Sequence, residues 1–367
     1  MSPIRALFGQ DIRTGSTLCG NMRGRRNDRN DLAVSEVIGV VMLLAMVISM
    51  MGGVFLLLTP YVNDFQDNSS YAAANGIAER FDERIELISG AKSGIGIKAV
   101  IEADTSSVTP IALVETWQIS ADLVHNEQVN VQFINQTSFS ITAQNESATS
   151  AHIWTPNGEE SFTFDSTHLP IIVTHNLSIY TMWVVTVSDE SNKEIHKSAY
   201  VQMSGLQITT NVQQGKHEIA LINDARYERF SGSPWSVTER PDLEIEELYD
   251  GTMRASLRLR DVSFIGPIPD GSSLNVNLES RGPLNLFSGD AWRMRFIYQS
   301  NLGDTINPQI HESWLQEYNL HRASGTLDEY RGISPWKRSS GLDGLTIDSG
   351  INKIDLEVDL HRVVISR

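Results

Sequence analysis

Histidine, serine and acidic residues are the side chains that could do chemistry here, and their spacing matches no catalytic or metal-binding pattern. No H-E-x-x-H sequence occurs, which is the spacing that brings two zinc ligands to one face of a helix. His311 precedes Glu312, but Leu315 stands where the second ligand would be. His168 and His175 are seven residues apart in a segment that we expect to be extended, so they need not share a face. We predict no metal site and no cofactor.

Patterns that mark a nucleophile are also missing from the sequence. It contains no G-x-S-x-G, the elbow that presents the serine of many hydrolases. Glu159-Glu160 and Glu246-Glu247 are adjacent pairs, and neighbouring side chains on a strand point to opposite faces. Cys19 is the sole cysteine, which excludes intrachain disulfides. We therefore predict no catalytic residues and no enzymatic activity, although residues distant in sequence could still assemble a site.

The balance of charge argues against nucleic acid as a partner. The 367 residues carry 29 Lys and Arg against 45 Asp and Glu, a formal net charge of −16. A protein that follows phosphate groups needs clustered basic residues to displace their counterions. Apolar residues make up 41% of the chain, which is enough for a folded core.

An uncharged apolar segment directly follows a basic stretch. Residues 1–36 hold six Arg and four acidic residues, and the 22 residues from Val37 to Leu58 carry no charge. As a helix this segment would be about 33 Å long, against a hydrocarbon core of about 30 Å. A secretory signal peptide has a shorter apolar region of about 7–15 residues, and a buried soluble helix is the other alternative. We predict a membrane span.

The residues from Asp31 to Val40, which read DLAVSEVIGV, precede this apolar run. Together they resemble the class III signal peptide of archaeal type IV pilins and pilin-like surface proteins. The resemblance implies that a prepilin peptidase removes the leader, residues 1–33, and that residues 34–60 remain as the N-terminal helix. By position the cut follows Ala33 and leaves Val34 first. The family commonly has a charged or polar residue where Leu32 stands, so the bond between Leu32 and Ala33 is the other candidate.

The same helix has features that suit packing against other helices. Small residues let helix backbones approach closely in a membrane or a filament. Glu36 suits the positive end of the helix dipole, and in pilins a glutamate near this position offsets the amino group of a neighbouring subunit. The resemblance therefore implies membrane lipid, prepilin peptidase and other pilin-like subunits as partners. The small residues are Gly39, Ala45, Ser49, Gly52 and Gly53.

Beyond Pro60 the apolar pattern is first that of a helix and then that of strands. Between residues 71 and 90 apolar residues recur at helical spacing, which predicts an amphipathic stalk helix within residues 61–94. From residue 97 onward apolar and polar residues alternate, the pattern of half-buried strands. We predict an α+β fold, with an N-terminal transmembrane helix and a mainly antiparallel, sandwich-like β domain outside. The apolar positions of the stalk are Ile77, Phe81, Ile85 and Ile88, and the clearest strand places Ile354, Leu356, Val358 and Leu360 on one face.

Gly, Ser and Pro cluster at residues 230–242. This cluster divides the exterior into β-rich regions 95–230 and 231–367, unless it is a long loop within one domain. We expect one helix in the second region, at about residues 308–320. Two strands of that region carry opposite charges, and if they are neighbours each cross-strand pair would contribute roughly 0.2–1 kcal/mol. The alternative is that both charged faces are simply solvated. The charged residues are Arg254, Arg258 and Arg260 on one strand and Asp355, Glu357 and Asp359 on the other.

Four N-x-S/T sequences lie beyond the apolar segment, which agrees with an exposed location. Their number is what chance predicts from the Asn, Ser and Thr content, so the count is no evidence of selection. They are at Asn68, Asn135, Asn145 and Asn176.

These features together indicate a pilin-like, membrane-anchored cell-surface subunit, structural or adhesive, in an archaeal type IV filament system. Arginines near a span favour a cytoplasmic location for their side. The chain would therefore cross the membrane once, with a cytoplasmic N-terminus and an extracellular C-terminal domain, or reside in a surface filament. The alternative is a non-assembling single-pass surface protein whose β domain binds a ligand.

Overall fold

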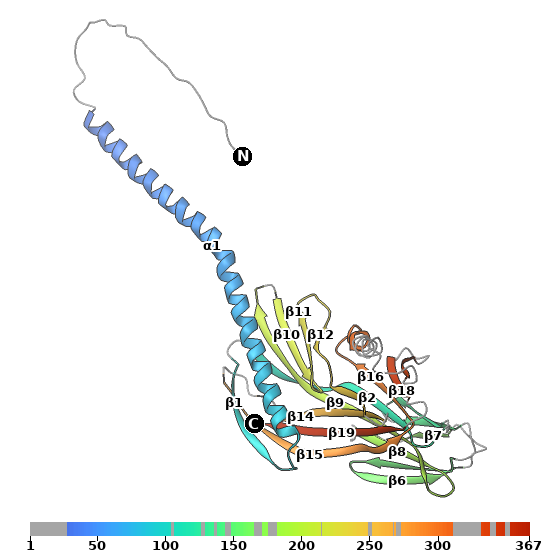
Figure 1. Cartoon of the computed structure of the whole chain (residues 1–367). Coiled ribbons are helices and arrows are strands. Elements are labelled where there is room, and N and C mark those ends of the chain that lie inside the picture. Colours follow the sequence, from blue (N-terminus) through green and yellow to red (C-terminus); the bar gives the residue numbers. More distant parts are fainter. Residues whose placement is uncertain are drawn as a thin grey trace, which may run out of the picture. The chain divides into compact units, whose positions relative to one another are not determined.

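The computed structural model divides the chain into two compact units, residues 1–63 and 64–367, and each is described by itself (Figure 1). It describes residues 28–367 except 104–105, 126–128, 136–137, 144–147, 165–170, 175–181, 214, 249–251, 267, 269–272, 311–331, 338–342 and 349–352.

One continuous helix, α1 (Asp28–Ser89), contains both helices that the sequence predicts. Pro60 lies inside it. A proline removes one backbone donor and crowds the preceding turn, but it does not force a helix to end. The residues that follow Pro60 include no second proline before Ser89, so the helical hydrogen bonding resumes. The chain enters the first strand after a turn in which the N–H of Ala91 donates to the carbonyl of Ile88, 3.0 Å away.

The part of α1 in the second unit is amphipathic, as predicted. Ile77, Phe81, Ile85 and Ile88 are all buried. They form one core cluster with apolar residues of β1, β2, β9, β10, β14, β15 and β19. Helical spacing places such side chains on one stripe, and the sheet residues cover that stripe.

The smaller of the two main sheets has five strands in the order β1-β15-β19-β14-β13. All neighbours are antiparallel except β14 and β19, which are parallel. The strands are β1 (Gly96–Glu102), β13 (Leu243–Glu247), β14 (Met253–Ile265), β15 (Ser273–Ala291) and β19 (Ile354–Ser366).

The two oppositely charged strands that the sequence singles out are neighbours in this sheet. Arg254 lies opposite Asp355 and Arg258 opposite Asp359. The Arg254 Nε atom is 3.1 Å from Asp355 Oδ2, and both side chains are about half exposed. An exposed ion pair of this kind contributes only about 0–1 kcal/mol to the folding free energy. Its main effect is to favour this alignment of β14 with β19.

The larger sheet has eleven strands and is built on the two long strands β2 and β9. Its main path is β12-β11-β10-β9-β2-β16-β18-β17, and β8, β5 and β6 form a branch from β9. Its strands are β2 (Ser106–Asp122), β5 (Ser150–Thr155), β6 (Gly158–Thr163), β8 (Met182–Ser188), β9 (Glu194–Val212), β10 (Gly215–Ile222), β11 (Ala225–Phe230), β12 (Ser236–Glu239), β16 (Arg293–Ser300), β17 (Gly332–Lys337) and β18 (Asp343–Asp348).

Strand β9 changes partner along one of its edges. It pairs with β2 along nearly its whole length, while its other edge pairs first with β8 and then with β10. Gly205 lies where the change occurs, and a Cβ atom there would clash with the backbone oxygen of Leu221. The close approach of the two backbones at this point therefore requires glycine.

Two apolar cores stabilise the sheets in addition to the one beneath α1. One contains residues of both main sheets, among them Trp117, Ile119, Leu257 and Leu356. The other lies between β5, β8 and β9 and a three-stranded sheet ordered β3-β4-β7. The strands of that sheet are β3 (Val129–Asn135), β4 (Ser138–Ala143) and β7 (Ile171–Thr174).

Strands from the two predicted exterior regions share sheets. β16 pairs with β2, and β12, which lies within residues 230–242, pairs with β11. These pairings join the two regions, and residues 64–367 form one compact unit. Residues 306–310 are helical, and the rest of the helix expected at 308–320 lies outside the described residues.

Candidate functional site

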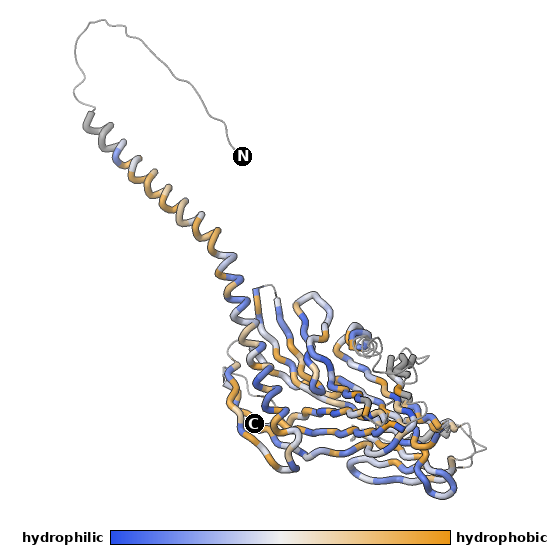
Figure 2. The backbone as a smooth tube through the Cα atoms, viewed as in Figure 1, coloured by the Kyte–Doolittle hydropathy of each residue, from blue (hydrophilic) through white to orange (hydrophobic). Residues whose placement is uncertain are grey.

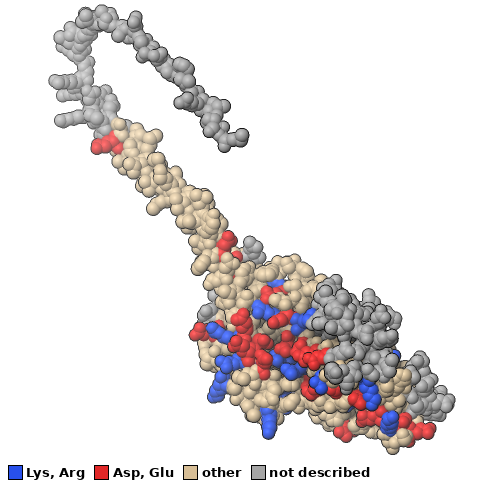
Figure 3. Space-filling view, in the orientation of Figure 1, with Lys and Arg blue, Asp and Glu red and all other residues tan. Residues whose placement is uncertain are grey.

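The apolar segment of α1 is the most unusual surface that the structure describes. Every large apolar side chain between Val37 and Leu58 is exposed, from 41% for Val47 to 76% for Leu56. By length and composition the helix could cross a membrane. Figure 2 shows the segment as a continuous hydrophobic stretch, and no charged side chain interrupts it in Figure 3. Soluble monomers rarely expose a contiguous apolar surface of this size.

The polar side chain of this segment, Ser49, and that of Thr59 directly after it are hydrogen-bonded within the helix. The Ser49 hydroxyl donates to the Ala45 carbonyl, and the Thr59 hydroxyl donates to the Phe55 carbonyl, each at 2.7 Å. Hydroxyl groups bonded in this way leave no unpaired donor for an apolar environment. The segment is thus suited both to lipid and to the apolar surface of another helix.

The small residues of the segment gather on one face. At 3.6 residues per turn, Ala45, Ser49, Gly52 and Gly53 fall within an arc of about 100°, and Gly39 lies about 40° beyond it. A Cβ atom added to any of the three glycines would contact nothing within 4 Å. A neighbouring helix could therefore approach this face closely.

The residues predicted at the processing site and at the helix start also lie on α1. Leu32, Ala33 and Val34 lie within it, but their side chains are outside the described residues. Glu36 is exposed and lies two turns after the start of the helix at Asp28. Because the dipole effect fades within the first turn, Glu36 would be at the positive end of the helix only after the leader is removed.

The structure describes part of the other predicted sites. Asn68 is exposed on α1, and Asn135 lies in β3 with its side chain outside the described residues. Asn145 and Asn176 lie outside them, as do His168, His175, His311, Glu312 and Leu315. Glu159 and Glu160 are exposed on β6. Among the residues that the structure describes, no three His, Cys, Asp or Glu side chains are placed to hold a metal ion.

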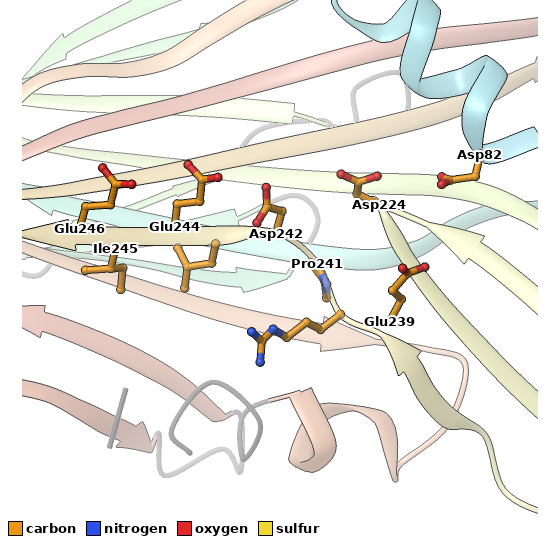
Figure 4. A pocket seen from close by; sticks show the side chains of 10 residues that line it. Asp82, Asp224, Glu239, Pro241, Asp242, Glu244, Ile245 and Glu246 are labelled. Atoms are coloured by element: carbon orange, nitrogen blue, oxygen red, sulfur yellow. The ribbon is translucent and has the colours of Figure 1, made fainter. Parts of the chain in front are cut away.

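A cleft of about 460 Å³ on the second unit is lined mainly by acidic side chains. Figure 4 shows the carboxylates of β13 following one another along the strand, with Asp82 of α1 and Asp224 beside each other. The acidic residues of the cleft are Asp82, Asp224, Glu239, Asp242, Glu244 and Glu246.

Arg260 partly neutralises two carboxylates of this cleft, Asp82 and Asp224. Its buried guanidinium lies 2.6 Å from Asp224 and 3.6 Å from Asp82. Burial nevertheless raises the pKa of Asp82 to about 6 against the opposing effect of Arg260, and the neighbouring carboxylates Asp224 and Glu239 contribute to this rise. Arg260 therefore belongs to an ion-pair network with acidic residues.

A buried carboxyl group, Glu115, lies in the main core. Tyr227 and Tyr298 donate hydrogen bonds to its Oε1 atom at 2.6 and 2.9 Å, and Trp117 donates to Oε2 at 3.3 Å. Burial raises the pKa of Glu115 to about 7, although the three donors act to lower it. Desolvation thus outweighs the hydrogen bonds, since an ionised carboxylate loses more solvation than three neutral donors restore.

A second buried polar network joins β2, β9 and β16. Asp122 Oδ1 lies 2.8 Å from His196 Nδ1, and His196 Nε2 lies 2.8 Å from the Ser198 hydroxyl. The Ser198 hydroxyl donates to the Ser120 hydroxyl oxygen at 3.1 Å. Arg295 donates to both oxygens of Asp122 at 3.2 and 3.3 Å.

No local motif could have revealed these two networks. Glu115 and Tyr298 are 183 residues apart in sequence, and Asp122 and His196 are 74 apart. The one local sign is the spacing of His196 and Ser198, which two residues apart on a strand must face the same side.

Comparison with known proteins does not assign the chain to a family. No protein-family model matches the chain, and no curated protein matches its sequence significantly.

Proposed function

We propose that the chain is a pilin-like, membrane-anchored cell-surface subunit of an archaeal type IV filament system, with a structural or adhesive role. The observation that carries the proposal is the uncharged helix from Val37 to Leu58, exposed over its whole length and preceded by residues that resemble a prepilin leader. In this proposal α1 crosses the membrane once, with a cytoplasmic N-terminus. The α+β unit of residues 64–367 is then the extracellular, sandwich-like domain.

The energetics of the exposed helix support a membrane or filament environment. Burying a single Leu, Ile, Val or Met side chain contributes about 1.5–3 kcal/mol, and the exposed segment offers seventeen large apolar side chains. Lipid would cover them while the subunit is in the membrane, and neighbouring helices would cover them in a filament. The face of small residues supports assembly over a simple anchor because it permits close helix contact.

The mature N-terminus tests the proposal directly. The protein is extracted from membranes of its native host, and its N-terminal peptide is identified by mass spectrometry. A start at Val34 or Ala33 is expected if a prepilin peptidase removes the leader. An intact leader would leave a single-pass anchor without pilin processing, and a start beyond Leu58 would show an ordinary signal peptide and contradict the proposal.

The alternative function is a non-assembling surface protein whose β domain binds a ligand, and the acidic cleft is the observation that favours it. Mechanical shearing of whole cells separates the two functions. A filament subunit is expected in part in the sheared fraction, together with other pilin-like subunits. A non-assembling anchor would stay entirely with the membranes.

A further inference from the structure

Asp122, His196 and Ser198 form a relay that the proposed function does not use. An acid that orients a histidine, which in turn contacts a hydroxyl, is the arrangement that activates a serine nucleophile. Both contacts are 2.8 Å long. Arg295 donates hydrogen bonds to both oxygens of the same Asp122 carboxylate. The first requirement of acyl transfer, an oriented base beside a hydroxyl, is therefore met.

The relay is closed to substrates from outside. His196 and Ser198 have no exposed surface, and Asp122 is 4% exposed. Val185 and Val187 of β8 lie opposite Ser198 and His196 and belong to the apolar core shared with β3 and β4. An electrophile for Ser198 must therefore come from the protein itself.

Gln118 supplies such an electrophile on the same face of the sheet. Asp122 pairs with His196, Ser120 with Ser198 and Gln118 with Tyr200. Gln118 is thus a diagonal neighbour of Ser198, and such neighbours are about 7–8 Å apart, within reach of a long side chain. Gln118 is 8% exposed, and its Oε1 atom has no hydrogen-bond partner among the described residues. A buried carboxamide oxygen without a partner requires an explanation.

We propose that Ser198 and Gln118 form an intramolecular ester between β9 and β2. The Ser198 hydroxyl turns its hydrogen toward His196 Nε2, which accepts the proton as the oxygen bonds to Cδ of Gln118. Ser120, hydrogen-bonded to Ser198, is placed to donate to the developing oxyanion. The bond between Cδ and Nε2 of Gln118 then breaks, and His196 returns the proton to the leaving amine. One hydroxyl and one carboxamide become one ester and one ammonia, with no oxidation or reduction.

In this reaction His196 is the catalytic residue and Asp122 is a positioning residue. Ser198 has no exposed surface and Gln118 is 8% exposed, which limits the access of water that would hydrolyse the ester. The ester would join two strands that are 80 residues apart at this point. It would resist separation of β2 from β9, the pair on which the larger sheet is built.

Peptide mapping of the full chain, purified in detergent, tests the proposal. In the wild type we expect a peptide containing Gln118 linked to one containing Ser198, lighter than their sum by one ammonia. Hydroxylamine should separate the two and leave a hydroxamate at Gln118. Unlinked wild-type peptides with an intact Gln118 carboxamide would overturn the proposal, and this result requires no variant.

Variants then assign the roles. Ser198→Ala should remove the link, whereas Ser236→Ala, which removes the same oxygen from an exposed residue of β12, should retain it. His196→Ala should also prevent the link while Ser198 is still present. A link that persists in Ser198→Ala or His196→Ala would refute the assignment. Each outcome is independent of the N-terminal processing on which the proposed function rests.

Discussion

Replacing Glu115 with glutamine should remove a large part of the pH dependence of the folding free energy. The pKa of Glu115 is about 7 in the folded protein, against the ordinary value of 4.5 that applies to the unfolded chain. Below about pH 4.5 the carboxyl is neutral in both states, so its burial carries no ionisation penalty. As the pH rises toward 7, the unfolded chain loses the proton first and folding becomes less favourable.

The difference of about 2.5 pKa units corresponds to about 3 kcal/mol at 1.36 kcal/mol per unit. Between about pH 5 and about pH 8 the wild type should therefore lose about 2–3 kcal/mol more stability than Glu115→Gln. The amide also changes the hydrogen bonds to Trp117 and the two tyrosines, which costs about 1 kcal/mol. That cost is the same at both pH values and cancels from the comparison.

Urea unfolding of the full chain in detergent, followed by tryptophan fluorescence at the two pH values, measures this difference. Glu194→Gln is the matched control, because it removes the same charge from an exposed position of β9. The control should retain the pH dependence of the wild type. If Glu115→Gln also retained it, the carboxyl would be ionised across the whole range, and desolvation would not dominate at this site.

Two further predictions concern how α1 and the acidic residues are held in the second unit. Phe81→Ala should reduce the unfolding free energy by about 3–5 kcal/mol, because Phe81 is fully buried. The control, Leu87→Ala on the exposed side of the same helix, should change the unfolding free energy by less than about 0.5 kcal/mol. Arg260→Ala should reduce the unfolding free energy by about 2–4 kcal/mol, because it leaves Asp224 without its buried partner. Arg254→Ala removes one side of an exposed ion pair and should reduce the unfolding free energy by less than about 1 kcal/mol. Urea unfolding measures all four, and equal losses for the two arginine variants would contradict the difference in burial.

Several features of the fold could be predicted because they depend on residues close in sequence. The stripe from Ile77 to Ile88 predicts a buried helix face, and these side chains are buried. The alternation of β19 predicts a half-buried strand, and its apolar side chains from Ile354 to Leu360 are buried as well. The complementary charges of β14 and β19 left open whether the two strands are neighbours or their charged faces are simply solvated, and the register shows that the strands pair.

Other features could not be predicted because no local pattern encodes them. Among the strand pairs that the structure describes, β14 and β19 are parallel whereas the other pairs are antiparallel. The division near residues 230–242 was suggested by loop-forming residues, but β12 lies within that segment and pairs with β11. Loop-forming composition shows where the chain turns. It does not show whether the next strand returns to the same sheet.

The apolar helix, the alternating strands and the acidic composition can be read from the chain alone, because each depends on the hydropathy and charge of residues a few positions apart. Which polar residues become buried neighbours depends on how distant strands pair in the folded protein. Glu115 meets Tyr227 and Tyr298 because β2 and β16 pair and β11 contributes to the same core. Asp122 meets His196, and Gln118 lies diagonal to Ser198, because one register aligns β2 with β9. If that register shifted by one residue, the side chains of one strand would point to the opposite face of the sheet from their present partners. These contacts therefore form only when β2 and β9 pair in this register.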